Sequence, residues 1–203
     1  MSLRLDHLAI AAETLEEGAA WAEMMLGVPL ESGGRHPHMG THNRLLSLGP
    51  DLYLEVITVD PGAIPPDRPR WFDLDRFHGE PRLHCWIAAC EDLDNTVAAS
   101  PNDLGEPISL VRGDLLWRMA IPDSGILPFD NVHPALIEWQ GEAHPTQRLP
   151  DKDVRLKRLI VRHPDAAGLS EALSTLDDPR VVLESGKPGL SAELETPRGP
   201  VHL

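Results

Sequence analysis

Four side chains that could bind a metal ion occur in two matching pairs. His7 lies in the apolar run LDHLAI, and Glu55 follows it in the run LYLEVI. His84 lies in the similar run RLHCWI, and Glu138 follows it in ALIEWQ. A buried carboxylate is costly unless it is neutralised, paired or bound to metal. Two imidazoles and two carboxylates suit a divalent transition ion that keeps open positions for water or substrate.

The segments that must position these residues repeat along the chain. The runs LDHLAI, RLHCWI and LKRLIV each read as a strand that precedes a helix, and they align His7, His84 and Arg158. Short strands follow each helix, so the same order of elements occurs three times at a nearly constant spacing. Such spacing predicts one repeated supersecondary unit. Because Arg158 replaces the histidine, we expect the third copy to be a structural module without metal ligands.

The repeats divide the chain into four predicted segments. Residues 1–60 form the first module, 83–141 the second and 142–203 the third. Residues 61–82, rich in proline, aspartate and aromatic residues, form a linker or lid between the first two modules. Strands mixed with helices in this order predict an α+β fold. If the first two modules pack about a pseudo-twofold axis, the four candidate ligands can converge.

Composition excludes several classes of partner. The 203 residues include 32 acidic and 18 basic ones, for a net charge of −14. This balance disfavours nucleic acid, which needs a basic surface. No apolar run approaches the ~20 residues of a membrane span, and the N-terminus lacks a signal-peptide layout. We therefore expect a cytoplasmic protein that binds neither nucleic acid nor membrane. Cys85 and Cys90 fit no disulfide framework and are expected to be reduced structural thiols.

The two matched pairs resemble the vicinal oxygen chelate superfamily, the group of glyoxalase I and the extradiol dioxygenases. SGGRHPHMGTHNRLLSLG with YLEVI is similar to its glyoxalase-like domain family. The resemblance implies βαβββ modules, two of which form a curled mixed-sheet cup. It also implies a divalent metal, Zn, Ni, Fe or Mn, held by His7, Glu55, His84 and Glu138. It implies no particular substrate, because the superfamily hosts many activities.

A histidine cluster, His36, His38 and His42, lies before and in the predicted strand THNRLLSLG. His36 and His38 are interpreted as residues of a solvated loop, although three histidines this close could form an alternative metal set. His42 and Asn43 are better candidates for substrate binding, because strand alternation points one of them into the cup.

Three further residues could contact a substrate. Arg118, in LLWRMAIP, could bind a carboxylate or phosphate, or could be a surface arginine. Trp86 shares a face with His84 and could line the cup or pack in the core. Trp71, with Phe72 beside it in the linker, could form a lid over the cup.

Two functions of different classes fit these observations. The first is a metal-dependent enzyme of the isomerase, lyase or dioxygenase type, acting on a small oxygen-rich substrate through a chelated enediolate-like intermediate. Glu138 is the first candidate for its general base and Glu55 the second. The alternative is a metal-free protein that binds or sequesters small molecules, such as drugs, in the same fold. Either could be a homodimer.

Overall fold

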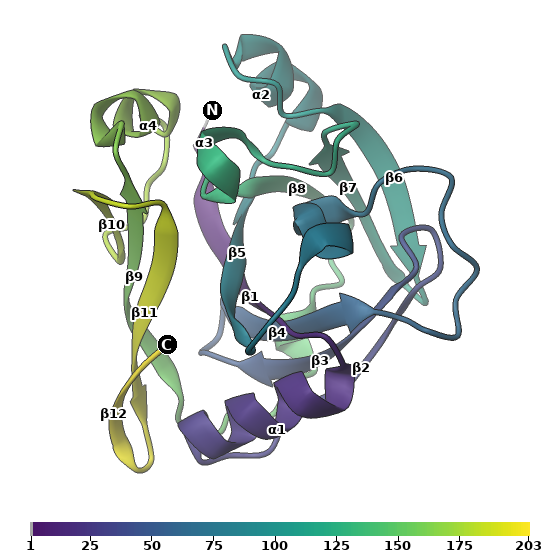
Figure 1. Cartoon of the computed structure of the whole chain (residues 1–203), viewed down its shortest axis with the longest axis vertical. Helices are drawn as coiled ribbons and strands as arrows, with labels where there is room; N and C mark the ends of the chain where they lie inside the picture. The colour runs from purple at the N-terminus through teal and green to yellow at the C-terminus, as the bar shows by residue number, and fades with distance from the viewer. Residues whose placement is uncertain (1) are drawn as a thin grey trace.

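The computed structural model describes residues 2–203, which form two sheets and their covering helices (Figure 1). The first module begins with β1 and α1, and three strands follow. Their bounds are β1 Arg4–Ala11, α1 Leu15–Leu26, β2 Glu31–His36, β3 Thr41–Ser47 and β4 Tyr53–Val59. The side chain of Thr14 caps α1 by accepting from the amide of Glu17, and Gly27 ends the helix at φ 73°. These are the usual signals for starting and stopping a helix.

The second module repeats this order after a linker that contains a short 3₁₀ helix, η1. The bounds are η1 Trp71–Arg76, β5 Arg82–Ala89, α2 Leu93–Ala99, β6 Glu106–Arg112, β7 Leu115–Ile121, α3 Pro128–Asn131 and β8 Ala135–Gln140. Together the two modules build one eight-stranded sheet in the order β2-β3-β4-β1-β5-β8-β7-β6. The sheet curls into a cup, and its edge strands β2 and β6 approach each other.

The two modules join through their first strands. β1 and β5 pair antiparallel at the centre of the sheet. Within each module the first strand pairs parallel with the last, β1 with β4 and β5 with β8. This equivalent pairing confirms the predicted α+β fold of repeated modules and the curled mixed-sheet cup.

The third module forms a separate sheet of four strands. Its elements are η2 Pro145–Gln147, β9 Arg155–His163, α4 Ala166–Ala172, β10 Val181–Ser185, β11 Gly189–Thr196 and β12 Gly199–His202. The strand order β10-β9-β11-β12 differs from that of the other modules, because β9 pairs parallel with β10. The element order of the repeat is present, but the pairing is not. Arg158 on β9 forms a surface ion pair with Glu193.

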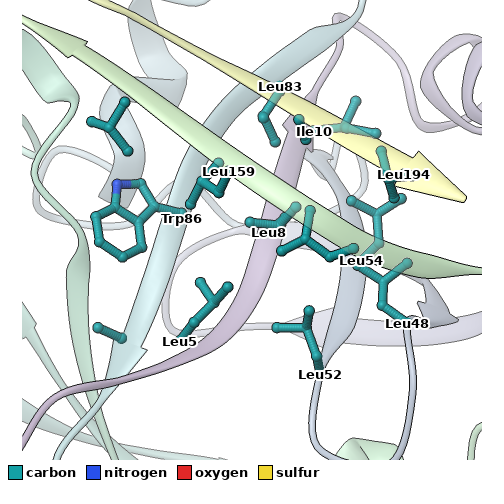
Figure 2. Packing of buried hydrophobic residues seen from close by; sticks show 14 of the residues in the cluster. Leu5, Leu8, Ile10, Leu48, Leu52, Leu54, Leu83, Trp86, Leu159 and Leu194 are labelled. Atoms are coloured by element: carbon teal, nitrogen blue, oxygen red, sulfur yellow. The ribbon is translucent and has the colours of Figure 1, made fainter. Parts of the chain in front are cut away.

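The eight-stranded sheet is buried on both faces. Its concave face encloses one apolar core, which includes Ala9, Ile87 and Ile137. The four-stranded sheet packs on the outer face, where β9 and β11 cross over β1 and β5 (Figure 2). Leu8 and Leu159 belong to this outer core and are fully buried. None of the helices in residues 2–203 is both long and apolar enough to cross a membrane.

Candidate functional site

Two of the predicted ligands face the interior of the cup from neighbouring strands. His7 on β1 is 3% exposed and Glu55 on β4 is 5% exposed. Nε2 of His7 lies 3.6 Å from Oε2 of Glu55, and the His7 ring stacks on Tyr53 at 4.3 Å between centroids. Strand alternation sends Leu8 and Leu54 to the outer core. The two functional side chains therefore form an ion pair inside the cup.

Asp6 fixes the orientation of the His7 ring. A register irregularity in β1 adjoins His7, and Oδ1 of Asp6 accepts a hydrogen bond from Nδ1 of His7 at 2.6 Å. The other oxygen of Asp6 accepts from Nε1 of Trp139 at 2.9 Å and from Nε2 of His144 at 3.2 Å. The imidazole thus lies between two carboxylates, with Nδ1 toward Asp6 and Nε2 toward Glu55.

Asn43 connects Glu55 to an arginine of the second module. Its Nδ2 donates to Oε1 of Glu55 at 2.5 Å. Its Oδ1 accepts from the amide of Gly34 at 2.7 Å and from Nη1 of Arg112 at 3.2 Å. Nη1 of Arg112 also donates to Nε2 of His36 at 3.0 Å. Because arginine only donates, His36 accepts through Nε2 and carries its proton on Nδ1.

Burial and the neighbouring charges set the protonation states in the cup. Burial alone would lower the pKa of His7, but the hydrogen bond to Asp6 and the Glu55 carboxylate raise it above 6.5. Burial would raise the pKa of Glu55, but His7 and Asn43 bring it down to about 2. Burial lowers the pKa of His36 to about 4. The cup therefore favours the imidazolium form of His7, beside an ionised Glu55 and a His36 that is neutral at neutral pH.

Aromatic side chains enclose this polar cluster. Trp71 from η1, Trp117 from β7 and Trp139 from β8 line a cavity of about 30 Å³, together with Met119 and Ile137. Such a volume holds only one or two water molecules. Nε1 of Trp71 is buried and has no hydrogen-bond partner among residues 2–203. An unsatisfied buried donor costs ~1–3 kcal/mol, so this indole N–H suits a ligand oxygen.

The 3₁₀ helix η1, which carries Trp71, has an uncommon backbone conformation. Phe72 and Asp73 have φ values of 60° and 57°, in the left-handed region that non-glycine residues seldom adopt. Nε2 of His84 donates to the carbonyl of Phe72 at 2.7 Å, and the amide of Asp73 donates to the carbonyl of Gly125 at 2.8 Å. Backbone strain of this kind persists only where the surroundings fix it, and it concentrates at functional sites.

The structure does not bring His84 and Glu138 to the cup. His84 does not line the cavity: it lies at a register shift of β5, and its Nε2 donates to the carbonyl of Phe72. Glu138 lies on the outer side of β8, 3.1 Å from Nη1 of Arg118, which also forms an ion pair with Asp94. Glu138 is therefore not in a position to act as the general base of the cup. Arg118, the predicted anion-binding residue, likewise lies outside it.

The remaining substrate-binding candidates divide between the two faces. Trp86 is fully buried in the outer core, where its Nε1 donates to the carbonyl of Val132 at 2.8 Å. His42 is half-buried and does not line the cup, whereas its neighbour Asn43 does. Trp71, on η1, lines the cup.

There is a physical reason why His84 and Glu138 do not line the cup. Strands β5 and β8 are apolar on both sides, because one face lines the cup and the other packs on the third module. Period-two alternation then shows which residues share a face but not which face is concave. On β8 the cup position is Ile137, one residue away from Glu138. On β5 a register shift at His84 breaks the alternation, so that Leu83 lies in the outer core and Cys85 in the cup.

The residues in the cup do not fit the expected divalent metal. Among residues 2–203 no group of three or more His, Cys, Asp or Glu side chains is arranged to hold a metal ion. Only His7 and Glu55 of the predicted four face the cavity, and the guanidinium of Arg112 lies one amide away from Glu55. A fixed positive charge at that place repels a divalent cation and attracts an anion.

Sequence reasoning missed three residues of the site. Asp6 was overlooked because a strand neighbour of His7 normally faces the other way. His36 was interpreted as a loop residue, yet it is buried at the end of β2, while His38 is exposed in the following turn. Arg112 lies at the end of an edge strand and gives no sequence signal of its own. Gly34 leaves room for the Arg112 side chain, because glycine has no side chain of its own.

Comparisons with known proteins agree with this architecture. A family model described as a glyoxalase-like domain matches residues 5–176. A hypothetical protein from Staphylococcus aureus of known structure has a TM-score of 0.63 and 16% identity, over 93% of this chain and 88% of that one. At such identity the similarity concerns the fold alone. A search of curated proteins found no match.

Two further solved structures are similar over part of the chain. A hypothetical protein from Bacillus halodurans has a TM-score of 0.45 and 17% identity, over 71% of this chain and 98% of that one. Methylmalonyl-CoA epimerase from Mycobacterium tuberculosis has a TM-score of 0.43 and 17% identity, over 68% and 88%. The family model spans most of the sequence, and the resemblance first noted in its motifs is thereby confirmed: the chain belongs to the glyoxalase-like domain family.

Proposed function

We propose that this protein is a metal-independent enzyme that moves a proton on the carbon beside a carbonyl group of a small carboxylate. The observation that carries the proposal is the buried ion pair of His7 and Glu55, placed beside the guanidinium of Arg112 in a closed cup. An acid and a base side by side, with a fixed positive charge, suit the formation and collapse of an enolate. Isomerase and lyase reactions both use this step.

Each side chain has a defined part in the proposed reaction. The ionised Glu55 takes the proton from the carbon, and burial removes the water that would otherwise solvate its carboxylate. The negative charge moves to the carbonyl oxygen, where the free N–H of Trp71 and the guanidinium of Arg112 can stabilise it. The His7 imidazolium can protonate that oxygen through Nε2, while Asp6 holds the ring by Nδ1. Collapse of the enol returns both protons.

A deuterium-exchange assay tests the proposal without knowledge of the natural substrate. Pyruvate and 2-oxobutyrate are incubated with the protein in D₂O, and loss of the C–H signal is followed by ¹H NMR. We expect exchange faster than in buffer, unchanged by EDTA. The metal content of the same sample is measured by elemental analysis, on protein purified without metal-affinity resin, because zinc, nickel, iron or manganese is the expected alternative.

Two arginines provide a matched pair of variants. Arg112→Met removes the positive charge from the cup, and Arg118→Met removes one from the outer ion pair with Glu138 and Asp94. We expect exchange to fall in the first and to persist in the second. About one metal per chain together with exchange abolished by EDTA would instead support the metal-dependent enzyme. Binding of the acids without any exchange would support the metal-free binding protein, for which the aromatic walls of the cup are the favourable feature.

A further inference from the structure

Arg112 spans the seam at which the two edges of the curled sheet meet. It lies at the end of edge strand β6, yet its guanidinium bonds to His36 on edge strand β2 and to Asn43 on β3. Its Nη1 makes both contacts across the seam, at 3.0 Å to Nε2 of His36 and at 3.2 Å to Oδ1 of Asn43. The side chain therefore closes the cup between two strand edges that do not pair with each other.

Gly34 makes room for this arrangement. A Cβ built on Gly34 would lie 2.6 Å from Cδ of Arg112 and 3.2 Å from its Nε. The arginine thus crosses directly over a position where any side chain would displace it. The displaced group would be a flexible side chain and not backbone, so an alanine at this position moves Arg112 without breaking the fold.

A second cavity lies on the outer side of the same arginine. It has a volume of about 380 Å³, against about 30 Å³ for the inner cup, and Arg112 lines both. Its apolar lining comes from Leu45, Leu115 and Leu149. The inner cavity is too small to hold a whole organic substrate. The volume of the outer groove falls within the ~300–1,000 Å³ usual for ligand sites.

Charges at the outer groove are already paired, apart from the end at the seam. Arg148 forms an ion pair with Asp114, and Lys152 forms one with Glu31. Arg112 instead bonds to the neutral His36 and to an amide, so its charge has no carboxylate within hydrogen-bond distance among residues 2–203. The groove is therefore apolar along its floor and cationic where it meets the cup.

We propose that the seam is the entrance to the cup and that the outer groove is a subsite for the apolar body of an oxo-carboxylate. The acid displaces His36 and Asn43 as the partner of Arg112, its reactive end enters the cup and its hydrocarbon tail lies on Leu45, Leu115 and Leu149. This inference rests on the proposed function and assigns it a substrate class, a carboxylate with an extended apolar chain.

A chain-length series tests the subsite. Straight-chain 2-oxo acids from pyruvate to 2-oxooctanoate are titrated while the fluorescence of the cup tryptophans is recorded. Burying a methylene is worth ~0.8 kcal/mol, so we expect Kd to fall about three- to fourfold for each methylene that enters the groove. Kd values independent of chain length would overturn the subsite. Retained binding and exchange of pyruvate would, in that case, leave the proposed function standing.

Two leucines and one glycine supply the variants. Leu149→Asn places a neutral polar side chain in the groove, and Leu116→Asn places one on β7 outside it, where the side chain is exposed. Only the first is expected to remove the gain from longer acids, with pyruvate affinity unchanged. Gly34→Ala is expected to weaken every acid about tenfold or more by displacing Arg112, with a melting curve to check folding. Equal behaviour of the two leucine variants, or unchanged affinity in Gly34→Ala, would contradict the entrance, and failure of every acid to bind would contradict both proposals.

Discussion

Asp6 and His7 are neighbours in the chain, and their side chains nevertheless bond to each other at 2.6 Å. On a regular strand they would point to opposite faces of the sheet. The irregular register of β1 beside His7 brings the Asp6 carboxylate to the imidazole. The same carboxylate accepts from Trp139 of the second module and from His144 beyond it. The orientation of one ring is thus fixed by three separate parts of the chain.

Glu55 and Glu138 form a matched test of which glutamate is the base. Glu55→Gln keeps the size of the side chain and an acceptor for Asn43, but the amide cannot accept a proton as a carboxylate does. We expect deuterium exchange to fall ~10²–10⁴-fold, the usual contribution of a general base. Glu138→Gln should leave exchange unchanged, because Glu138 faces the outer ion pair with Arg118. A larger loss in Glu138→Gln would show that the wrong glutamate has been assigned.

Protonation of His7 predicts the pH dependence of exchange. The hydrogen bond from His7 to Asp6 and the Glu55 carboxylate raise the pKa of His7 above 6.5, so the imidazolium is lost only as the pH rises through the raised value. Glu55, with a pKa of about 2, stays ionised over the same range. Exchange should therefore be constant in weakly acid solution and should fall as the pH rises through the raised pKa of His7. NMR titration of the His7 ring would give the midpoint, and a midpoint below 6.5 would contradict the ion pair.

The low pKa of Glu55 also predicts a loss of stability in acid. Its pKa is about 2 in the folded chain against an ordinary value of 4.5, so the folded state favours the ionised form. The resulting stability is fully present above pH 4.5 and is lost as the pH falls toward 2. We expect Tm to drop over this window, and less steeply in Glu55→Gln. Parallel Tm curves for the two proteins would mean that Glu55 is not held as an ion pair.

His84 is expected to stabilise the lid and to have no part in catalysis. His84→Leu removes the donor to the Phe72 carbonyl and leaves a left-handed turn less constrained. We expect faster hydrogen–deuterium exchange of amides in residues 71–77, because the Phe72 carbonyl then keeps only the 3.5 Å hydrogen bond from Asn131. Loss of one hydrogen bond costs ~0.5–1.5 kcal/mol. His78→Leu, at an exposed linker position, is the control. Unchanged protection of the lid in His84→Leu would remove His84 from this role.

Sequence patterns predicted the modules better than they predicted the site. Periodicity and element order indicated the repeat, and His7, Glu55, Asn43 and Trp71 were identified because each combines a chemical side chain with an apolar run. The other half of the expected ligand set, His84 and Glu138, does not line the cavity. Nothing in the sequence of β5 or β8 distinguishes the concave face, because the third module buries the convex one. That information exists only once all three modules are packed.

Arg112 could not be found in this way for a different reason. It belongs to the site because two sheet edges, far apart in the chain, curl until they meet. Sequence spacing carries no measure of how far a sheet curls. The local signal was the pair of glycines at 33 and 34, which indicates close approach of another group but does not name it.

The sheet packed behind β1 gives remote leucines influence over the cup. Leu159 of β9 and Leu194 of β11 belong to the core that packs against the outer face of β1 (Figure 2). The inner face of the same strand carries His7. Truncation of either leucine leaves a cavity that the surrounding side chains fill only in part. Densely packed interiors transmit the resulting strain to neighbouring residues. Changes of side-chain volume in the C-terminal sheet are therefore expected to tune the distance between His7 and Glu55. Selection on the chemistry of the first module thus extends to the size of residues more than a hundred positions later in the chain.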